Sequence, residues 1–217
     1  MIFNSRQQAG KLLADRLTGI VGINAVVIGL ARGGVIVAHE ISSRLNLPLD
    51  VLVVKKISSQ LDPELALGAL APDGVSYLDW KLAQSLGVDE DTLNSKLIPD
   101  IQKLIDNRLL LYKRGRKHLE VKGRTVILVD DGVATGATMQ AAVKWTKKKK
   151  AKRIVVAVPV VPPDFVSAII NDIDDILVLD TPDDFRAVGQ FYRNFPQIAD
   201  GEVVQLLAVS HQSSAVR

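Results

Sequence analysis

The chain has 217 residues, and 47% of them are apolar, which is enough for an α/β domain with a hydrophobic core and excludes a disordered or fibrous protein. Lysine and arginine exceed aspartate and glutamate by 27 to 24, a small positive balance. The absence of cysteine excludes disulfides, thiolate metal sites and a cysteine nucleophile, and no apolar run approaches the roughly 20 residues of a membrane span.

The first segment predicts an amphipathic helix. Ser5 is a candidate N-cap, and the apolar residues that follow recur at helical spacing: Ala9, Leu12, Leu13 and Leu17. Charged residues are mixed into this segment, which therefore lacks the apolar centre of a signal peptide. A cytoplasmic location is expected.

The next segments predict a βαβ unit. The run AVVIGL (25–30) is wholly apolar, as is typical of a strand that is buried on both faces. After Arg32, Gly33 and Gly34 come a helical apolar stripe and a second buried run, DVLVVKKI (50–57), which we interpret as one strand. Such a unit implies a parallel sheet with a right-handed crossover.

Residues 58–78 interrupt this alternation. They contain two prolines and two glycines without a clear period, which indicates a mobile flap or a hairpin. A charged helical region is predicted from about residue 89 to residue 118, with Pro99 as a kink or break. Strands at 125–130, 153–160 and 175–181 then alternate with helices at about 137–149 and 164–170, which predicts an α/β fold with a doubly wound parallel sheet.

Two basic clusters, KRGRK (113–117) and KKKKAKR (147–153), hold the positive excess. Such clusters can bind nucleic acid, but cations also complement the dipole at a helix C-terminus. We favour the second interpretation, because no aromatic residue interleaves the second cluster. Nucleic acid is therefore not an expected partner.

The segment FRAVGQFYRNF (185–195) holds four of the ten aromatic residues. They could pack the tail onto the sheet, or they could form a lid or stacking wall for a planar ligand. The sequence leaves both interpretations open.

The stretch VILVDDGVATGAT (126–138) contains the candidate ligand-binding residues. Asp130 and Asp131 stand at the carboxyl end of a predicted buried strand, where ligands bind in open parallel sheets. The loop that follows has small residues and leads into a helix, so its N–H groups suit a phosphate, with hydroxyls from Thr135 and Thr138. Carboxylates beside a phosphate suit sugar hydroxyls or Mg²⁺. The predicted ligand is a sugar phosphate with vicinal hydroxyls, and we expect the acidic pair to serve that ligand, since adjacent carboxylates repel each other.

These residues resemble the phosphoribosyl diphosphate (PRPP) binding motif of the type I phosphoribosyltransferases. Further segments resemble a bacterial branch of that family: LARGG (30–34), VVKKI (53–57), PELALGALAPDG (63–74) and 185–207. The resemblance implies one domain over 1–217 with a small hood. Its core would be about 20–57 and 120–182, and the rest would form a flexible flap (58–78), a helical insertion (79–118) and a tail (183–217).

The resemblance also implies roles for single residues. Asp130 and Asp131 would bind the ribose hydroxyls and contribute indirectly to a Mg²⁺ site, with the metal held mainly by PRPP. The 5-phosphate and its surroundings would be held by the loop residues Gly132, Val133, Ala134, Thr135, Gly136, Ala137 and Thr138. Pyrophosphate would contact the loop of Arg32, Gly33 and Gly34, which often contains a cis peptide in this family, together with Lys55 or Lys56. Arg32, Lys56, Asp130 and Asp131 are the predicted catalytic residues.

The implied activity is transfer of ribose 5-phosphate from PRPP to a nucleobase or another nitrogen acceptor, with Mg²⁺ as cofactor and release of pyrophosphate. The expected partners are PRPP and an acceptor that the sequence leaves unidentified, and self-association into a homo-oligomer stays open. The alternative is a non-catalytic regulator that senses PRPP or a nucleotide. The position two before Gly136 is Ala134, where 6-oxopurine transferases usually carry an acid, so hypoxanthine and guanine are expected to be poor acceptors.

Overall fold

The computed structural model describes residues 1–22, 24–58, 66–88, 91, 93–114 and 119–214. Its centre is a five-stranded parallel sheet in the order β2-β1-β6-β7-β8. The strands are β1 (Ala25–Leu30), β2 (Leu49–Leu52), β6 (Thr125–Val129), β7 (Arg153–Val160) and β8 (Asp175–Asp180). The strand order places β1 and β6 side by side in the middle of the sheet, so the loops that follow these two strands are neighbours.

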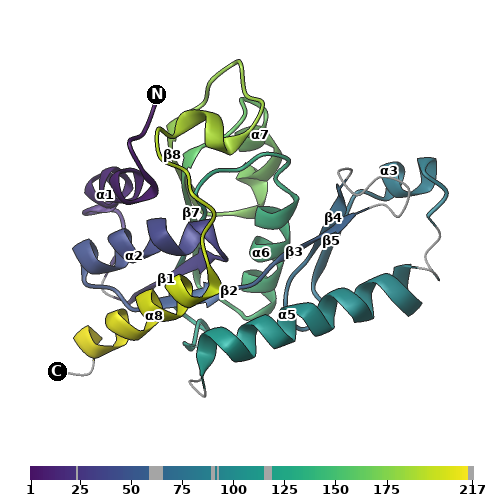
Figure 1. Ribbon diagram of the computed structural model, residues 1–217, viewed down its shortest axis with the longest axis horizontal. Helices are drawn as coiled ribbons and strands as arrows, with labels where there is room; N and C mark the ends of the chain where they lie inside the picture. Colours follow the sequence, from purple (N-terminus) through teal and green to yellow (C-terminus); the bar gives the residue numbers. More distant parts are fainter. Residues whose placement is uncertain (23, 59–65, 89–90, 92, 115–118, 215–217) are drawn as a thin grey trace.

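Helices cover both faces of the sheet (Figure 1). One side carries α1 (Arg6–Leu17), α2 (Gly33–Leu45) and α8 (Asp200–Ser214), and the other carries α6 (Ala137–Lys148) and α7 (Phe165–Ile169). Val27 and Ile127 pack into the first layer, whereas Val26 and Val126 pack into the second. Because alternate residues of each strand meet a helix layer, the strands are apolar throughout. The prediction of a doubly wound parallel sheet is confirmed.

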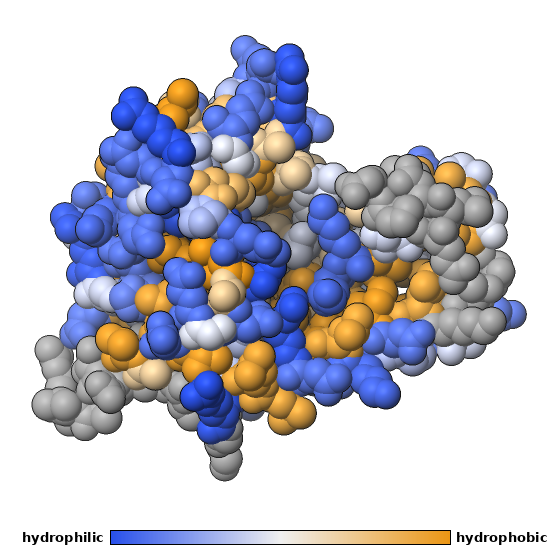
Figure 2. All heavy atoms as spheres, in the orientation of Figure 1, coloured by the Kyte–Doolittle hydropathy of each residue, from blue (hydrophilic) through white to orange (hydrophobic). Residues whose placement is uncertain are grey.

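A second, antiparallel sheet of β3 (Lys55–Ser58), β4 (Ala66–Leu70) and β5 (Ser76–Leu78) forms a lobe beside this core. The long helix α5 (Ile98–Lys113) runs from the lobe beneath the core (Figure 1), and the lobe also holds α3 (Trp80–Ser85) and the π-helix η1 (Leu93–Leu97). In the space-filling view a notch separates core and lobe, and apolar side chains show on the lobe below it (Figure 2).

The interpretation of residues 50–57 as one strand was wrong. Leu52 ends β2 opposite Leu30, which is the last residue of β1. Beyond this point β1 turns into α2 and offers no further partner. The chain therefore leaves the central sheet, and Lys55 pairs antiparallel with Leu70 in the lobe. An apolar run cannot reveal such a change of sheet, because both halves of the run are buried.

Of the two interpretations of residues 58–78, the structure shows a hairpin for the part from residue 66 onwards. β4 and β5 pair antiparallel, and the β4 side chains of Leu67 and Leu70 are fully buried. Residues 59–65, where a closing flap is predicted, lie outside the described residues. Pro99 lies in the first turn of α5, directly after the π-helix η1 (Leu93–Leu97), so the regular α-helix begins only at this point, which agrees with the predicted break.

Both basic clusters begin at a helix C-terminus, as the sequence analysis favoured, and the second one continues through the turn after α6 to Arg153, the first residue of β7. Lys113 is the last residue of α5, and Lys147 and Lys148 lie in the last turn of α6. Residues 115–118 lie outside the described residues. Among the residues that the structure describes, no helix combines the length and the apolar character that crossing a bilayer requires.

Close packing of β1 against α2 leads to a stability prediction. A Cβ atom on Gly29 would lie 2.7 Å from the Val35 Cα and 2.9 Å from the Ala38 Cβ, so α2 would have to move away from the strand. We expect Gly29→Ala to lower the free energy of unfolding by about 1–3 kcal/mol, measured by chemical denaturation.

The matched control is Gly22→Ala, because a Cβ atom on Gly22 would have no atom within 4 Å. Its effect should stay within about 0.5 kcal/mol. Equal stability of the two variants would contradict the close approach of α2 to β1.

Candidate functional site

The two acidic residues lie where the central strand ends. Asp130 and Asp131 follow β6 directly, and a loop of small residues then enters α6 with Gly136 as the N-cap at φ 80°. The N–H groups in the first turn of a helix have no partner within the helix and carry partial positive charge. The loop 132–136 therefore has the arrangement that anion binding requires.

A cavity of about 160 Å³ opens above this loop. Two other parts of the chain close it: Lys56 from β3 in the lobe, and Val188 from the 3₁₀-helix η3 (Val188–Phe191) in the tail. The remaining lining residues come from the end of β6, the loop and the first turn of α6: Asp130, Gly132, Val133, Ala134, Thr135, Gly136, Thr138 and Met139. One carboxylate, one ammonium group and the loop thus face the same space. Six members of the predicted set do not line the cavity: Arg32, Gly33, Gly34, Lys55, Asp131 and Ala137.

The structure distinguishes the two neighbouring lysines. Lys56 is exposed and lines the cavity, whereas Lys55 is half-buried and lies outside it. Successive side chains of a strand point to opposite faces, so only one member of the pair can face the cavity. The sequence left the choice between them open for the pyrophosphate contact, and the fold selects Lys56 as the lysine beside the loop.

The Arg32 loop packs against the acidic pair. A Cβ atom on Gly33 would lie 1.9 Å from the Asp131 Oδ2, and one on Gly34 would lie 2.6 Å from the Val129 carbonyl oxygen. Only glycine allows such an approach. The Ala31–Arg32 peptide bond is cis, as the resemblance implied. The two loops predicted to bind opposite ends of one ligand are therefore in direct contact.

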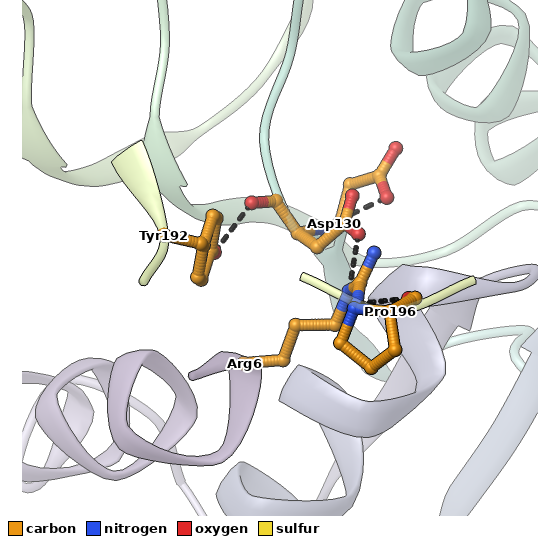
Figure 3. A network of polar contacts seen from close by, with 5 residues as sticks. Arg6, Asp130, Tyr192 and Pro196 are labelled. Atoms are coloured by element: carbon orange, nitrogen blue, oxygen red, sulfur yellow. Dashed lines mark hydrogen bonds and ion pairs between the residues drawn. The ribbon is translucent and has the colours of Figure 1, made fainter. Parts of the chain in front are cut away.

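Arg6 is a charged residue at this site that the sequence analysis did not identify. Its Nε donates to the Asp131 Oδ2 at 2.6 Å, and its Nη1 donates to the Pro196 carbonyl oxygen at 2.9 Å (Figure 3). The guanidinium also lies 3.7 Å from the centre of the Phe195 ring. Both charged side chains of this ion pair are largely buried, at 7% exposure for Arg6 and 15% for Asp131.

This ion pair shows that the protein itself compensates one of the two carboxylates, whereas the contacts predicted for the pair with ribose stay predictions. Asp131 is neutralised from within the protein by a residue of α1, 125 positions away along the chain. One signal in the sequence could have indicated it. Arg6 is the first residue of its helix, where a cation opposes the helix dipole and no acidic residue in the first turn compensates it. A buried cation at that position is stable only with an anionic partner from another part of the chain.

Asp130 has a different electrostatic environment. Burial raises the pKa of its carboxyl group well above the ordinary value, and the negative charge of Asp131 raises it further. The Arg6 guanidinium opposes this rise, and the Asp131 N–H donates to the Asp130 Oδ1 at 2.8 Å. The carboxyl group of Asp130, which lines the cavity, therefore holds its proton more strongly than an ordinary aspartate.

The aromatic tail packs onto the core. Tyr192 stacks on Phe195 with ring centres 4.9 Å apart, and its hydroxyl donates to the Asp131 carbonyl oxygen at 2.6 Å. Burial raises the Tyr192 pKa, so the phenol is a neutral donor. Phe191 and Phe3 belong to the same buried cluster. Phe191 and Tyr192 are thus used in packing, which agrees with the first of the two interpretations that the sequence left open for residues 185–195.

A model of the phosphoribosyl transferase domain matches residues 2–195, which include both loops and nearly all of the fold described above. The chain belongs to the phosphoribosyl transferase domain family. The membership confirms the resemblance drawn from residues 126–138.

Relatives of this phosphoribosyl transferase domain include proteins from two strains of Mycobacterium tuberculosis, CDC 1551 and H37Rv, which are named provisionally as phosphoribosyl transferases. Each is 41% identical over 217 residues, with 99% of this chain but 48% of the relative covered. The chain thus spans about half the length of these curated relatives.

Among solved structures, a protein from Thermus thermophilus is similar over 95% of this chain and 98% of its own, with 37% identity and a TM-score of 0.81. A purine phosphoribosyltransferase from Pyrococcus horikoshii shares the fold, with a TM-score of 0.50 and 22% identity over 91% of this chain and 97% of its own.

The raised pKa of Asp130 gives the domain a testable pH dependence. A folded-state pKa above the unfolded value of about 3.9 means that ionisation costs the folded state more than the unfolded state. Stability is therefore lost as the pH rises above about 4 toward the folded-state pKa. We expect Asp130→Asn, measured without Mg²⁺, to be more stable than the wild type at pH 7 and to lose this advantage near pH 4.

Asp164→Asn, which changes an exposed aspartate at the start of α7, serves as the control for the loss of a surface carboxylate. Thermal unfolding between pH 4 and pH 8 measures both variants. A constant difference between Asp130→Asn and the wild type would contradict the raised pKa.

Proposed function

We propose that this domain transfers ribose 5-phosphate from PRPP to a nitrogen nucleophile and releases pyrophosphate. The observation that carries the proposal is the cavity in which Asp130, Lys56 and the loop at the start of α6 face one another. A phosphate on the loop, a sugar beside a carboxylate and an anionic leaving group near a lysine satisfy all three features at once. Family membership supports the same reaction class.

The proposed reaction breaks the bond between C1 of the ribose and the pyrophosphate oxygen, and forms a bond from C1 to the acceptor nitrogen, which gives up a proton. Positive charge develops on the ribose ring and negative charge on pyrophosphate. The Asp130 carboxylate would lie beside the ribose, and the cation of Lys56 would stabilise the leaving group. Arg32, which does not line the cavity, would add a second cation from the neighbouring loop at the start of α2. No covalent intermediate with the protein is required.

The donor set suits a Mg²⁺ ion that arrives with PRPP. Mg²⁺ commonly binds through one or two carboxylates together with substrate phosphates, and Asp130 lines the cavity. A cation bound there would favour the ionised form of this carboxyl group, against the burial and the acidic neighbour that raise its pKa. Asp130 would therefore contact the ion or its bound water, while Asp131 stays paired with Arg6. When bound, Mg²⁺ would neutralise charge that develops on pyrophosphate.

Arg32 gives a test of the leaving-group assignment. We expect Arg32→Ala to weaken binding of pyrophosphate and PRPP by about 1.5–3 kcal/mol, or roughly ten- to a hundredfold, because a charge-assisted contact is lost. Ribose 5-phosphate, which lacks pyrophosphate, should bind nearly as before. Calorimetry with the three ligands measures this.

Arg44→Ala, at the far end of the same helix α2, should leave all three affinities unchanged, because Arg44 is exposed and pairs with Asp15. Equal losses for the three ligands in Arg32→Ala would overturn the assignment of this arginine to pyrophosphate.

The acceptor is tested by a screen of nucleobases and amines for release of pyrophosphate from PRPP with Mg²⁺. Ala134 is exposed at the cavity and cannot move a proton, so we expect hypoxanthine and guanine to be poor acceptors. Turnover of either purine at about 1 per second or faster would contradict the argument from Ala134. Binding of PRPP without turnover of any acceptor would instead favour a sensor.

A further inference from the structure

Arg6 joins three separate segments at the site. It lies at the start of α1, contacts Asp131 at the end of β6, and binds the tail through the Pro196 carbonyl oxygen and the Phe195 ring. These contacts use the edge and the face of the planar guanidinium. A lysine, with its compact ammonium group, could form one of them but not all three at once.

The protein holds Asp131 at both its side chain and its backbone. The Arg6 Nε donates to the Asp131 Oδ2, and the Tyr192 hydroxyl donates to the Asp131 carbonyl oxygen. Gly33 packs directly against the Asp131 side chain. The neighbours of this fixed residue are the ones that face the cavity: Asp130 before it and Gly132 after it. A change at Asp131 would therefore change the direction of the Asp130 carboxylate and the first residue of the loop.

We propose that Arg6 is a positioning residue, which acts through Asp131 to orient the Asp130 carboxylate and the loop 132–136 for the ribose phosphate. Asp130 is then the carboxylate that contacts the sugar, and the role of Asp131 is to fix it. The identity of the ligand rests on the proposed function, whereas the positioning of the loop does not depend on it.

The test compares Arg6→Gln, Arg6→Lys, Asp131→Asn and the double variant Arg6→Gln/Asp131→Asn, each at a temperature where it is folded. Calorimetry measures binding of PRPP, ribose 5-phosphate and pyrophosphate. We expect Arg6→Lys and Arg6→Gln to weaken PRPP and ribose 5-phosphate by about tenfold or more and pyrophosphate by less than about twofold. The double variant should bind no more weakly than Asp131→Asn, because Arg6 acts only through Asp131.

A purely structural role for Arg6 would lower the unfolding temperature without this difference between ligands. Arg16→Gln, an exposed arginine in the last turn of the same helix, is the control and should change nothing. The proposal is overturned if folded Arg6 variants bind ribose 5-phosphate like the wild type, if all three ligands weaken equally, or if the two single effects add in the double variant.

Amide hydrogen exchange separates this inference from the proposed function. In Arg6→Gln and Arg6→Lys, a peptide spanning residues 130–136 should exchange faster, while a peptide from β7 should not change. If the wild type binds neither PRPP nor ribose 5-phosphate, the proposed function fails, and exchange alone decides the positioning role. Unchanged exchange in residues 130–136 would overturn it.

Discussion

Two adjacent carboxylates at the buried end of the central strand are the constraint on which the site depends. Asp130 and Asp131 repel each other and lose hydration where they lie. The fold compensates one of them by placing Arg6 against it, and leaves the other facing a cavity. Asp131 is therefore the carboxylate that Arg6 neutralises, at a point where three segments of the chain are in contact. Asp130 is the carboxylate that can contact a ligand in the cavity.

This division explains why the start of α1 and residues 195–196 meet at the site. Arg6, at the start of α1, binds Asp131 at the end of β6. In the tail, the Phe195 ring and the Pro196 carbonyl oxygen contact the same guanidinium. Removal of one partner of a buried ion pair typically costs about 3–5 kcal/mol, because the other charge stays buried and unpaired. The same guanidinium that neutralises Asp131 thus also holds the start of α1 against Pro196. Figure 3 shows these contacts in a single view.

The departure of the chain from the central sheet has a functional consequence as well. After β2 the chain enters the lobe, and β3 brings Lys56 to the loop that follows β6. A ligand in the cavity would consequently contact both the core and the lobe. The contacts between Gly33, Gly34 and the acidic pair bring a third segment, the start of α2, to the same place. The loop after β6 and Lys56 of the lobe thus line one cavity, and the start of α2 packs against the acidic pair beside it.

The sequence by itself determined the parallel sheet, the helix layers and the loop 132–136, because these depend on local periodicity and on short runs of small residues. Buried strands are apolar on both faces, and a loop that must expose its backbone N–H groups has small side chains wherever it occurs. The order of acidic residues, small loop and helix in residues 126–138 also sufficed to indicate the family.

Only the tertiary structure decided which charges meet. It paired Arg6 with Asp131, selected Lys56 over Lys55 for the cavity, and committed Tyr192 to packing. The division of residues 50–57 between two sheets was equally hidden, since burial gives both halves the same apolar composition. The physical reason is the same in each case, because each outcome depends on a partner that is distant along the chain. Lys55 pairs with Leu70, 15 positions away, and Arg6 pairs with Asp131, 125 positions away. No local sequence pattern specifies such a partner.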